Sequence, residues 1–187
     1  MSGKYRTIVA DPPWEYLSWP VGRTPAGAEH DGRRTAIGYP TMAVDEIAAL
    51  PVSEMAEDDA HLYLWTTNRY LWVAPGVASA WGFRVAQVLI WAKKPMGKGP
   101  GGAFAQNAEF IVFCRRGSLP HQEKQESVWF NWSRTASHSA KPDAFLDLVE
   151  QVSPGPYLEL FARRARFGWD YWGDQSLGTA EMPEAAA

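Results

Sequence analysis

The sequence predicts an α/β protein whose mostly parallel sheet carries helices on both faces. Its length of 187 residues suits one domain. Short apolar runs of strand length alternate along the chain with segments of helical spacing, which is typical of parallel sheets. Unusual polar residues follow several of these runs, at the strand ends where such sheets bind ligands. We expect one domain over residues 1–176 and a frayed tail over 177–187.

Composition and charge exclude several classes of protein. The chain is 46% apolar and 21% charged, which argues against a disordered or fibrous protein. One cysteine, Cys114, excludes an internal disulfide and a Cys-rich zinc site. The net charge of −3 excludes a globally basic nucleic-acid coat. No signal-peptide core and no run of 18 apolar residues are present, so we interpret the chain as cytoplasmic, without a membrane segment.

Strands are predicted where short apolar runs end at turn residues. The first run, YRTIVA, is followed by two prolines, which cannot donate to a sheet ladder and therefore end the strand. The other runs have the length and the bordering turn residues of buried strands. We predict strands over residues 5–10, 61–67, 83–93, 108–114, 127–132 and 157–162, and a short one over 168–173.

Three segments have apolar residues at helical spacing. Residues 41–51 form the first, with Thr41 as the expected N-cap. Residues 69–82 form the second, which we expect Pro75 to break or kink. Residues 143–152 form the third, and the sequence SPGP ends it. The long segments 15–40 and 94–106 are rich in Gly and Pro and are predicted to be loops.

The sequence Asp11-Pro12-Pro13-Trp14 follows the first strand directly. The two prolines fix two φ angles, so the turn holds Asp11 and Trp14 in a fixed relation. The Asp11 carboxylate and the Pro12 carbonyl can accept both hydrogens of an exocyclic amino group while the Trp14 indole stacks on the ring. The alternative interpretation is a strand-ending turn in which Asp11 caps nearby backbone.

This turn and six further segments resemble the MT-A70 family of adenine N6-methyltransferases. The segments occur in the family's order and span nearly the whole chain from Lys4 to Gln175. They are GYPTMAVDEIAALPV, HLYLWTTNRYL, VLIWAKK, SAKPDAFLDLVEQVSPG, LELFAR and WGDQ. The resemblance implies a Rossmann-like S-adenosylmethionine-dependent methyltransferase fold with a permuted motif order. The catalytic turn is then N-terminal and the cofactor strand C-terminal.

The resemblance also assigns residues. It implies that Asp11, Pro12, Pro13 and Trp14 form the catalytic turn, with no metal ion involved. For S-adenosylmethionine, Lys141 matches the lysine near the methionine portion, and Glu159 lies where ribose hydroxyls would pair with it. The further residues that match cofactor positions are Asp11, Phe161, Arg163, Asp174 and Gln175.

For the nucleic acid, we expect Trp14 and Tyr39 near the base. Basic residues cluster in the two long loops, where phosphate contact is the favoured interpretation over solvated surface charge. Among them we assign substrate binding to Arg33, Arg34, Lys93 and Lys94. The target adenine has to leave its stack, so unpaired DNA or RNA is the easiest substrate. We favour DNA, because the chain carries no appended RNA-binding module.

Two other functions stay open at this point. Some members of the family are catalytically silent subunits that scaffold a partner and bind nucleic acid, and the intact Asp11 turn and Lys141 argue against this. A methyltransferase acting on a protein amide would show Asn-Pro-Pro-Tyr, so Asp11 and Trp14 argue against that one. The family often works as dimers, and the sequence is compatible with a homodimer or a heterodimer.

Overall fold

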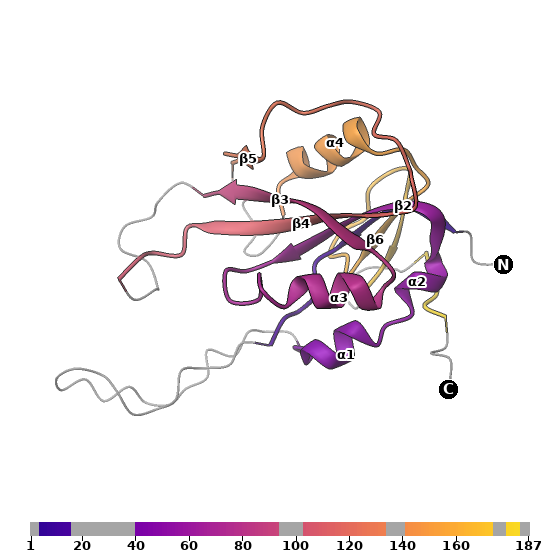
Figure 1. Ribbon diagram of the computed structural model, residues 1–187, viewed down its shortest axis with the longest axis horizontal. Coiled ribbons are helices and arrows are strands. Elements are labelled where there is room, and N and C mark those ends of the chain that lie inside the picture. The colour runs from indigo at the N-terminus through magenta and orange to yellow at the C-terminus, as the bar shows by residue number, and fades with distance from the viewer. Residues whose placement is uncertain (1–3, 16–39, 94–102, 134–140, 174–178, 184–187) are drawn as a thin grey trace.

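The computed structural model describes residues 4–15, 40–93, 103–133, 141–173 and 179–183. Within these residues the chain forms one seven-stranded sheet and four helices (Figure 1). The strands are β1 (Tyr5–Ala10), β2 (Ala56–Thr66), β3 (Arg84–Ala92), β4 (Ala108–Arg116), β5 (Trp129–Phe130), β6 (Tyr157–Leu160) and β7 (Trp169–Trp172). The helices are α1 (Val44–Ala48), α2 (Val52–Met55), α3 (Ala74–Ala80) and α4 (Asp143–Val152).

The sheet has the order β5-β3-β4-β2-β1-β6-β7 and is mostly parallel. Strand β1 pairs in parallel with β2 on one side and with β6 on the other. Strand β4 is the exception, because it pairs antiparallel with both β2 and β3. The predicted α/β class with a mostly parallel sheet is therefore confirmed. The reversed strand also brings the beginning of β4 to the edge where the parallel strands end.

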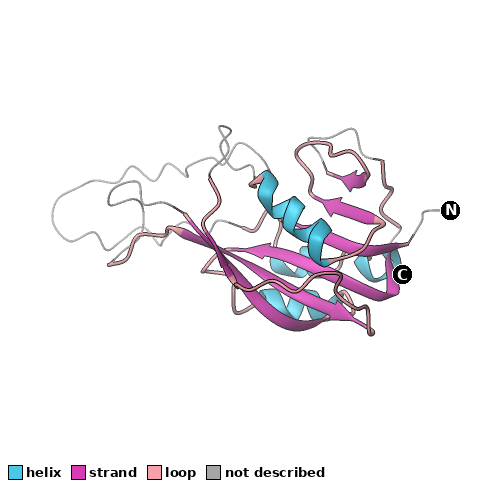
Figure 2. Ribbon diagram, turned by 90° about the horizontal axis from the view of Figure 1, so that it is seen from above, coloured by secondary structure: helices cyan, strands magenta, loops and turns pink. Residues whose placement is uncertain are grey.

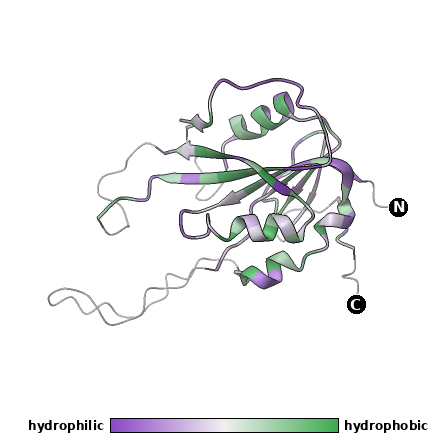
Figure 3. Ribbon diagram, viewed as in Figure 1, coloured by the Kyte–Doolittle hydropathy of each residue, from purple (hydrophilic) through white to green (hydrophobic). Residues whose placement is uncertain are grey.

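Helices cover both faces of the sheet, as the sequence predicts. In Figures 1 and 2, α4 lies on one face, and α1, α2 and α3 lie on the other. The alternation along β1 explains this, since Ile8 and Ala10 pack in the core with the first three helices. Val9 packs on the opposite side with Phe145 and Val149 of α4. Figure 3 shows α4 as a helix with both hydrophobic and hydrophilic residues, which fits a helix that buries one side.

Two expectations about helix ends are wrong. Helix α1 begins at Val44 with Ala43 as its N-cap, so Thr41 does not cap it. The reason is a bridge between Met42 and Trp14, in which the Met42 amide donates to the Pro13 carbonyl and keeps residues 41–42 out of the helix. The helix predicted over residues 69–82 covers only Ala74–Ala80, and Pro75 lies in its first turn, where no intrahelical amide bond is lost.

Several strand ends differ from the prediction. Strand β2 begins five residues earlier than expected, and β5 keeps only two of its six predicted residues. Strand β6 stops at Leu160 because Phe161 takes a φ of 63°, a left-handed conformation that cannot continue a strand. The turn after β6 is close to the end of β7: a Cβ on Gly173 would lie 2.8 Å from the backbone N and O of Ala162.

Cys114 is fully buried, and burial raises the pKa of its thiol to about 12. The thiol therefore acts as a small apolar core group, as expected. None of the helices in the described ranges is long and apolar enough to cross a membrane. The expected boundary between domain and tail, at residues 176–177, lies outside the described residues.

Candidate active site

Four charged side chains meet at the edge of the sheet where the parallel strands end. Asp11 follows β1 and Lys93 follows β3. Glu109 is the second residue of β4, and it reaches the same edge because β4 runs in the opposite direction. Lys141 comes from the segment just before α4. The topology therefore brings together residues that lie far apart in the sequence.

These four side chains form a chain of alternating charge. The Lys141 Nζ lies 3.0 Å from Asp11 Oδ1 and 2.9 Å from Glu109 Oε2. Lys93 pairs with the other oxygen of Glu109. The Lys141 ammonium also lies 4.7 Å from the centroid of the Trp65 ring, a cation–π contact. All four side chains are between 16% and 21% exposed, so they are shielded but reach solvent.

The network keeps Lys141 and Glu109 ionised. Burial opposes the charge of Lys141, but Asp11 and Glu109 outweigh it and raise the pKa of the ammonium above its ordinary value. Burial likewise opposes ionisation of Glu109, yet Lys141 and Lys93 together lower the pKa of its carboxyl. At neutral pH the site thus presents a fixed set of charges of both signs, ready for a ligand that carries both.

A pocket of about 400 Å³, partly open to solvent, lies beside this network. Val9, Asp11 and Lys141 line one part of it, and Glu159 and Phe161 line another. We call it the carboxyl-edge pocket; its other lining residues are Trp65, Phe145, Leu146, Arg163 and Arg164. The pocket combines apolar walls with a few convergent charged groups, which is the usual composition of a ligand site.

Glu159 is the unusual carboxylate of this pocket. Leu158 and Leu160 are buried on the other face of the sheet, so the alternation of β6 turns Glu159 toward the pocket. Burial, with a smaller contribution from Asp11, raises the pKa of its carboxyl to about 7. Within the described part of the chain, no group donates a hydrogen bond to it. Glu159 is therefore a carboxylate that would gain from hydrogen-bond donors on a ligand.

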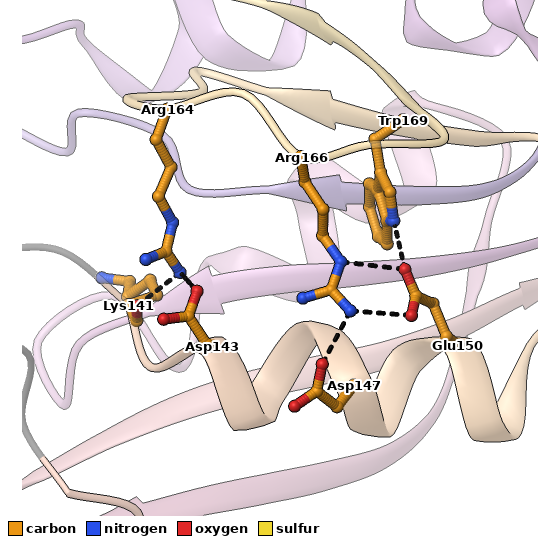
Figure 4. A network of polar contacts seen from close by, with 7 residues as sticks. All are labelled: Lys141, Asp143, Asp147, Glu150, Arg164, Arg166 and Trp169. Carbon is orange, nitrogen blue, oxygen red and sulfur yellow. Dashed lines mark hydrogen bonds and ion pairs between the residues drawn. The ribbon is translucent and has the colours of Figure 1, made fainter.

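The turn after β6 is anchored on α4 by two arginines (Figure 4). Arg164 pairs with Asp143 at 2.6 Å and donates to the Lys141 carbonyl at 3.0 Å. Arg166 contacts Asp147 and Glu150, each at 2.7 Å. These contacts fix the backbone that carries Arg163 into the pocket, and they fix the backbone of Lys141 as well.

In the Asp11–Trp14 turn, the surroundings of the Trp14 ring differ from the expectation. This indole is only 5% exposed, donates from Nε1 to the Trp65 carbonyl at 2.9 Å, and stacks on Tyr70 at 5.1 Å. An open stacking face on Trp14 is therefore not present, because core contacts occupy its ring. The Pro12 carbonyl accepts the Trp14 amide at 2.8 Å, which leaves one of its two lone pairs for another donor.

The structure brings together Asp11, Lys93, Lys141 and Glu159 at this edge, with Phe161 and Arg163 in the same pocket. It adds Glu109, which the sequence analysis did not select. The feature of the sequence that could have indicated Glu109 is its position as a single acidic residue in an otherwise apolar strand, AEFIVFC. The remaining predicted residues lie outside the described ranges and stay predictions: Arg33, Arg34, Tyr39, Lys94, Asp174 and Gln175.

Comparison with known proteins identifies the family to which the chain belongs. A mostly parallel sheet with a charged pocket at the strand ends is typical of Rossmann-like α/β folds, which bind their ligands there. The MT-A70 family model matches residues 5–175, and the chain therefore belongs to the MT-A70 family. Among the described residues, no group of three or more His, Cys, Asp or Glu is placed to hold a metal ion.

The relatives of the chain are named as methyltransferases. Over 181 residues it is 30% identical to the type II methyltransferase M.MunI of Mycoplasma sp. The aligned residues cover 91% of this chain and 77% of that protein. It is 26% identical over 188 residues to the human N(6)-adenosine-methyltransferase catalytic subunit METTL3, covering 94% of this chain but 29% of METTL3. The N(6)-adenosine-methyltransferase MT-A70-like protein of Arabidopsis thaliana is 25% identical over 191 residues. These residues cover 97% of this chain and 25% of the length of that relative.

Proposed function

We propose that this chain transfers a methyl group from S-adenosylmethionine to the N6 amino group of an unpaired adenine in DNA. The observation that carries the proposal is the position of Asp11. Its carboxylate follows the central strand, is fixed by Lys141 at 3.0 Å, and opens onto the same pocket as Glu159. A turn for the amino group and a pocket for a nucleoside cofactor are thus adjacent.

The residues of the carboxyl-edge pocket fit S-adenosylmethionine, which supplies an electrophilic methyl group on sulfur. Its ribose offers two hydroxyl donors, and Glu159 is a shielded carboxylate that lacks donors among the described residues. Its methionine portion carries an ammonium and a carboxylate, and Asp11 and Lys141 offer one charge of each sign. Phe161 and Leu146 supply apolar walls.

The chain's own groups can prepare the amino nitrogen for reaction. The lone pair of the adenine N6 is delocalised into the ring, so the nitrogen is a poor nucleophile. Hydrogen bonds from its two N–H groups to the Asp11 carboxylate and the Pro12 carbonyl would favour a tetrahedral nitrogen with a localised lone pair. In this direct displacement the nitrogen would form a bond to the methyl carbon while the bond from that carbon to the cofactor's sulfur breaks. The sulfur would leave as a neutral thioether, and the nitrogen would release one proton to solvent. Catalysis is mainly orientation of the two reactants.

Lys141 has a second function in this proposal. Its ammonium lies between the carboxylates of Asp11 and Glu109 and holds both in place, through contacts of 3.0 and 2.9 Å. The contact fixes the Asp11 carboxylate in a position where an approaching amino group can donate to it. Trp14 is a positioning residue: its buried indole donates a hydrogen bond to the Trp65 carbonyl of β2 and so fixes the turn on the sheet.

DNA is favoured over RNA by the degree of similarity to the relatives. The chain is 30% identical to a relative named as a type II methyltransferase. It is 26% and 25% identical to two relatives named for adenosine, the ribonucleoside. Phosphate contacts by Lys93 and Lys94 and by the segment with Arg33 and Arg34 belong to the proposal, although Lys93 is already paired with Glu109.

The test is a competition between substrates. The purified chain and S-adenosylmethionine are incubated with equal amounts of single-stranded DNA and RNA of the same mixed sequence, and the nucleosides are analysed by mass spectrometry. N6-methyldeoxyadenosine in excess over N6-methyladenosine supports the proposal, and the reverse ratio moves the substrate to RNA. Absence of both, together with absence of cofactor binding, would indicate a silent subunit that needs a partner. Duplex DNA in a parallel reaction checks that the adenine must be unpaired.

A further inference from the structure

A second hollow lies on the α4 face of the sheet, at the other end of the helix. It has a volume of about 920 Å³, part of it open to solvent, and lies between β2, β3, β4, the second half of α4 and residues 121–130. We call it the α4 pocket. None of its lining residues lines the carboxyl-edge pocket. In Figure 1 the chain between β4 and β5 arches over α4 as an extended segment, and Figure 3 shows that segment as largely hydrophilic.

The walls of the α4 pocket are apolar and aromatic. They come from the sheet and from the second half of α4, and include Tyr63, Leu89, Phe113, Leu148 and Val152. Phe113 is held edge-on to His61 and tilted against Tyr63, with centroid distances of 5.0 and 4.9 Å. Aromatic surfaces fixed in this way suit the flat body of a small molecule.

Two buried donors in this pocket lack a partner. Arg115 Nε and Gln125 Nε2 are the two buried side-chain nitrogens without a hydrogen-bond partner among the described residues, and both residues line the α4 pocket. A buried donor without an acceptor costs free energy, so a bound oxygen would stabilise each of them. Because both groups are donors, the missing partner is an acceptor.

The buried His61 of this pocket does not compete for that acceptor. His61 is fully satisfied, since Nδ1 lies 2.7 Å from Ser153 Oγ and Nε2 lies 3.1 Å from the Leu119 carbonyl. Burial lowers its pKa to about 4, so the ring is neutral. The charged groups in the lining are Arg115 and Lys124 against Glu123, which leaves a positive balance, and His121 stands beside them.

We propose that the α4 pocket binds a small planar aromatic carboxylate, with its ring against Phe113 and Leu148 and its oxygens on Arg115 and Gln125. Two carboxylate oxygens match two orphan donors, and the guanidinium supplies the counter-charge. The ring fills an apolar hollow of the size that small ligands occupy. This site is distinct from the proposed methyl-transfer site, and the inference does not depend on that function.

The test uses 2-naphthoate as the probe and the full chain labelled with ¹⁵N. We expect the titration to shift the amide resonances of Phe113, Arg115 and Gln125 and to leave those of Asp11 and Glu159 unchanged. Naphthalen-2-ylmethylammonium, with the same ring and the opposite charge, is expected to bind at least about tenfold more weakly. Absence of shifts up to the solubility limit, or shifts confined to the carboxyl-edge pocket, would overturn the proposal.

Two variants locate the site. Gln125→Ala removes one orphan donor without breaking a described hydrogen bond and should weaken 2-naphthoate binding about tenfold. Gln151→Ala, the same change at an exposed position of α4, should leave it unchanged. Leu148→Trp fills the hollow and should abolish binding. Thermal unfolding checks that each variant is folded, and if Leu148→Trp is not, the comparison of the two glutamine variants decides. Equal affinity of Gln125→Ala and the unchanged protein contradicts the proposal.

Discussion

The two pockets on the α4 face differ in how their polar groups are satisfied. At the carboxyl-edge pocket, ions from four separate elements pair with one another, and Lys141 lies between two carboxylates. Beside the α4 pocket, a neutral network takes the place of these ion pairs: Tyr63, Ser153 and His61 form a chain of hydrogen bonds of 2.7 Å each. Burial raises the pKa of Tyr63 and lowers that of His61, which keeps both uncharged.

This difference indicates what each pocket can accept. A site with fixed charges of both signs stabilises a ligand with complementary charges and can bias a reacting nitrogen. A site whose neutral polar groups satisfy each other leaves apolar surface for binding, and here two buried side-chain donors, Arg115 Nε and Gln125 Nε2, remain without a partner among the described residues. Substitutions at the first pocket should therefore affect catalysis and cofactor binding, whereas those at the second should affect folding stability or the binding of an apolar ligand.

The largest effect is expected for Asp11→Asn. The amide keeps the shape of the side chain but replaces one of the two acceptor oxygens with an NH2 donor, and it has no charge. We expect kcat to fall by about 10²–10³-fold with a much smaller change in cofactor affinity. Nucleoside mass spectrometry over time measures the rate. The matched control is Asp45→Asn at an exposed position on α1, which should keep full activity; retained activity in Asp11→Asn would remove Asp11 from the mechanism.

Lys141→Met should weaken both binding and folding. It leaves Asp11 and Glu109 without their shared cation, so we expect the dissociation constant of S-adenosylmethionine to rise at least about tenfold. The free energy of unfolding should fall by about 3 kcal/mol. Calorimetric titration and urea unfolding measure the two quantities, with Lys4→Met at an exposed position as control.

A second change separates the charge of Lys141 from its packing. In the double variant Glu109→Gln, Lys141→Met, one of the two stranded carboxylates is neutral, so part of the lost stability should return. Additive losses of the two single changes would show that Lys141 and Glu109 are not coupled.

Cofactor affinity should depend on pH through Glu159. Its pKa of about 7 in the free chain means that it is protonated in mild acid, whereas ribose hydroxyls donate to the ionised form. Binding then releases a proton, and the dissociation constant should fall about tenfold or more as pH rises from about 5.5 to 8. The folding stability of the free chain changes with pH in the opposite direction. Glu159 has a raised pKa in the folded chain, so its contribution to stability is lost as pH rises through about 7.

The variant Glu159→Gln cannot titrate, and its affinity should stay flat over this range. A slope that persists in Glu159→Gln would assign the pH dependence to another group.

The smallest effect on function is expected at the neutral network. Ser153→Ala removes the hydroxyl that bonds both His61 and Tyr63, and should lower the free energy of unfolding by about 2 kcal/mol. Methyl transfer at a temperature where the variant is folded should not change. Ser79→Ala, an exposed serine on α3, is the matched control. A loss of activity without a loss of stability would contradict the separation of the two pockets.

The parts of the structure that follow local rules were predictable. Apolar runs and proline positions located β1, β6 and α4, and the alternation of β6 turned Glu159 toward the pocket. Glu109 could not be predicted from its own neighbourhood, because its position depends on the reversed direction of β4. The burial of Trp14 depends on Tyr70, which stacks on it from a turn 56 residues further along the chain. The α4 pocket depends on a segment without any periodic pattern, for which the sequence gives no spacing to interpret.

The most direct measurement is an amide-resonance titration of the ¹⁵N-labelled chain with S-adenosylmethionine. If the charged edge holds the cofactor, the resonances of Asp11, Lys141, Glu159 and Phe161 shift together with a single dissociation constant. Those of Phe113 and Gln125, in the α4 pocket, stay in place. Shifts at Phe113 and Gln125 with none at Asp11 and Glu159 would contradict the assignment of the methyl-transfer site to the carboxyl edge of the sheet.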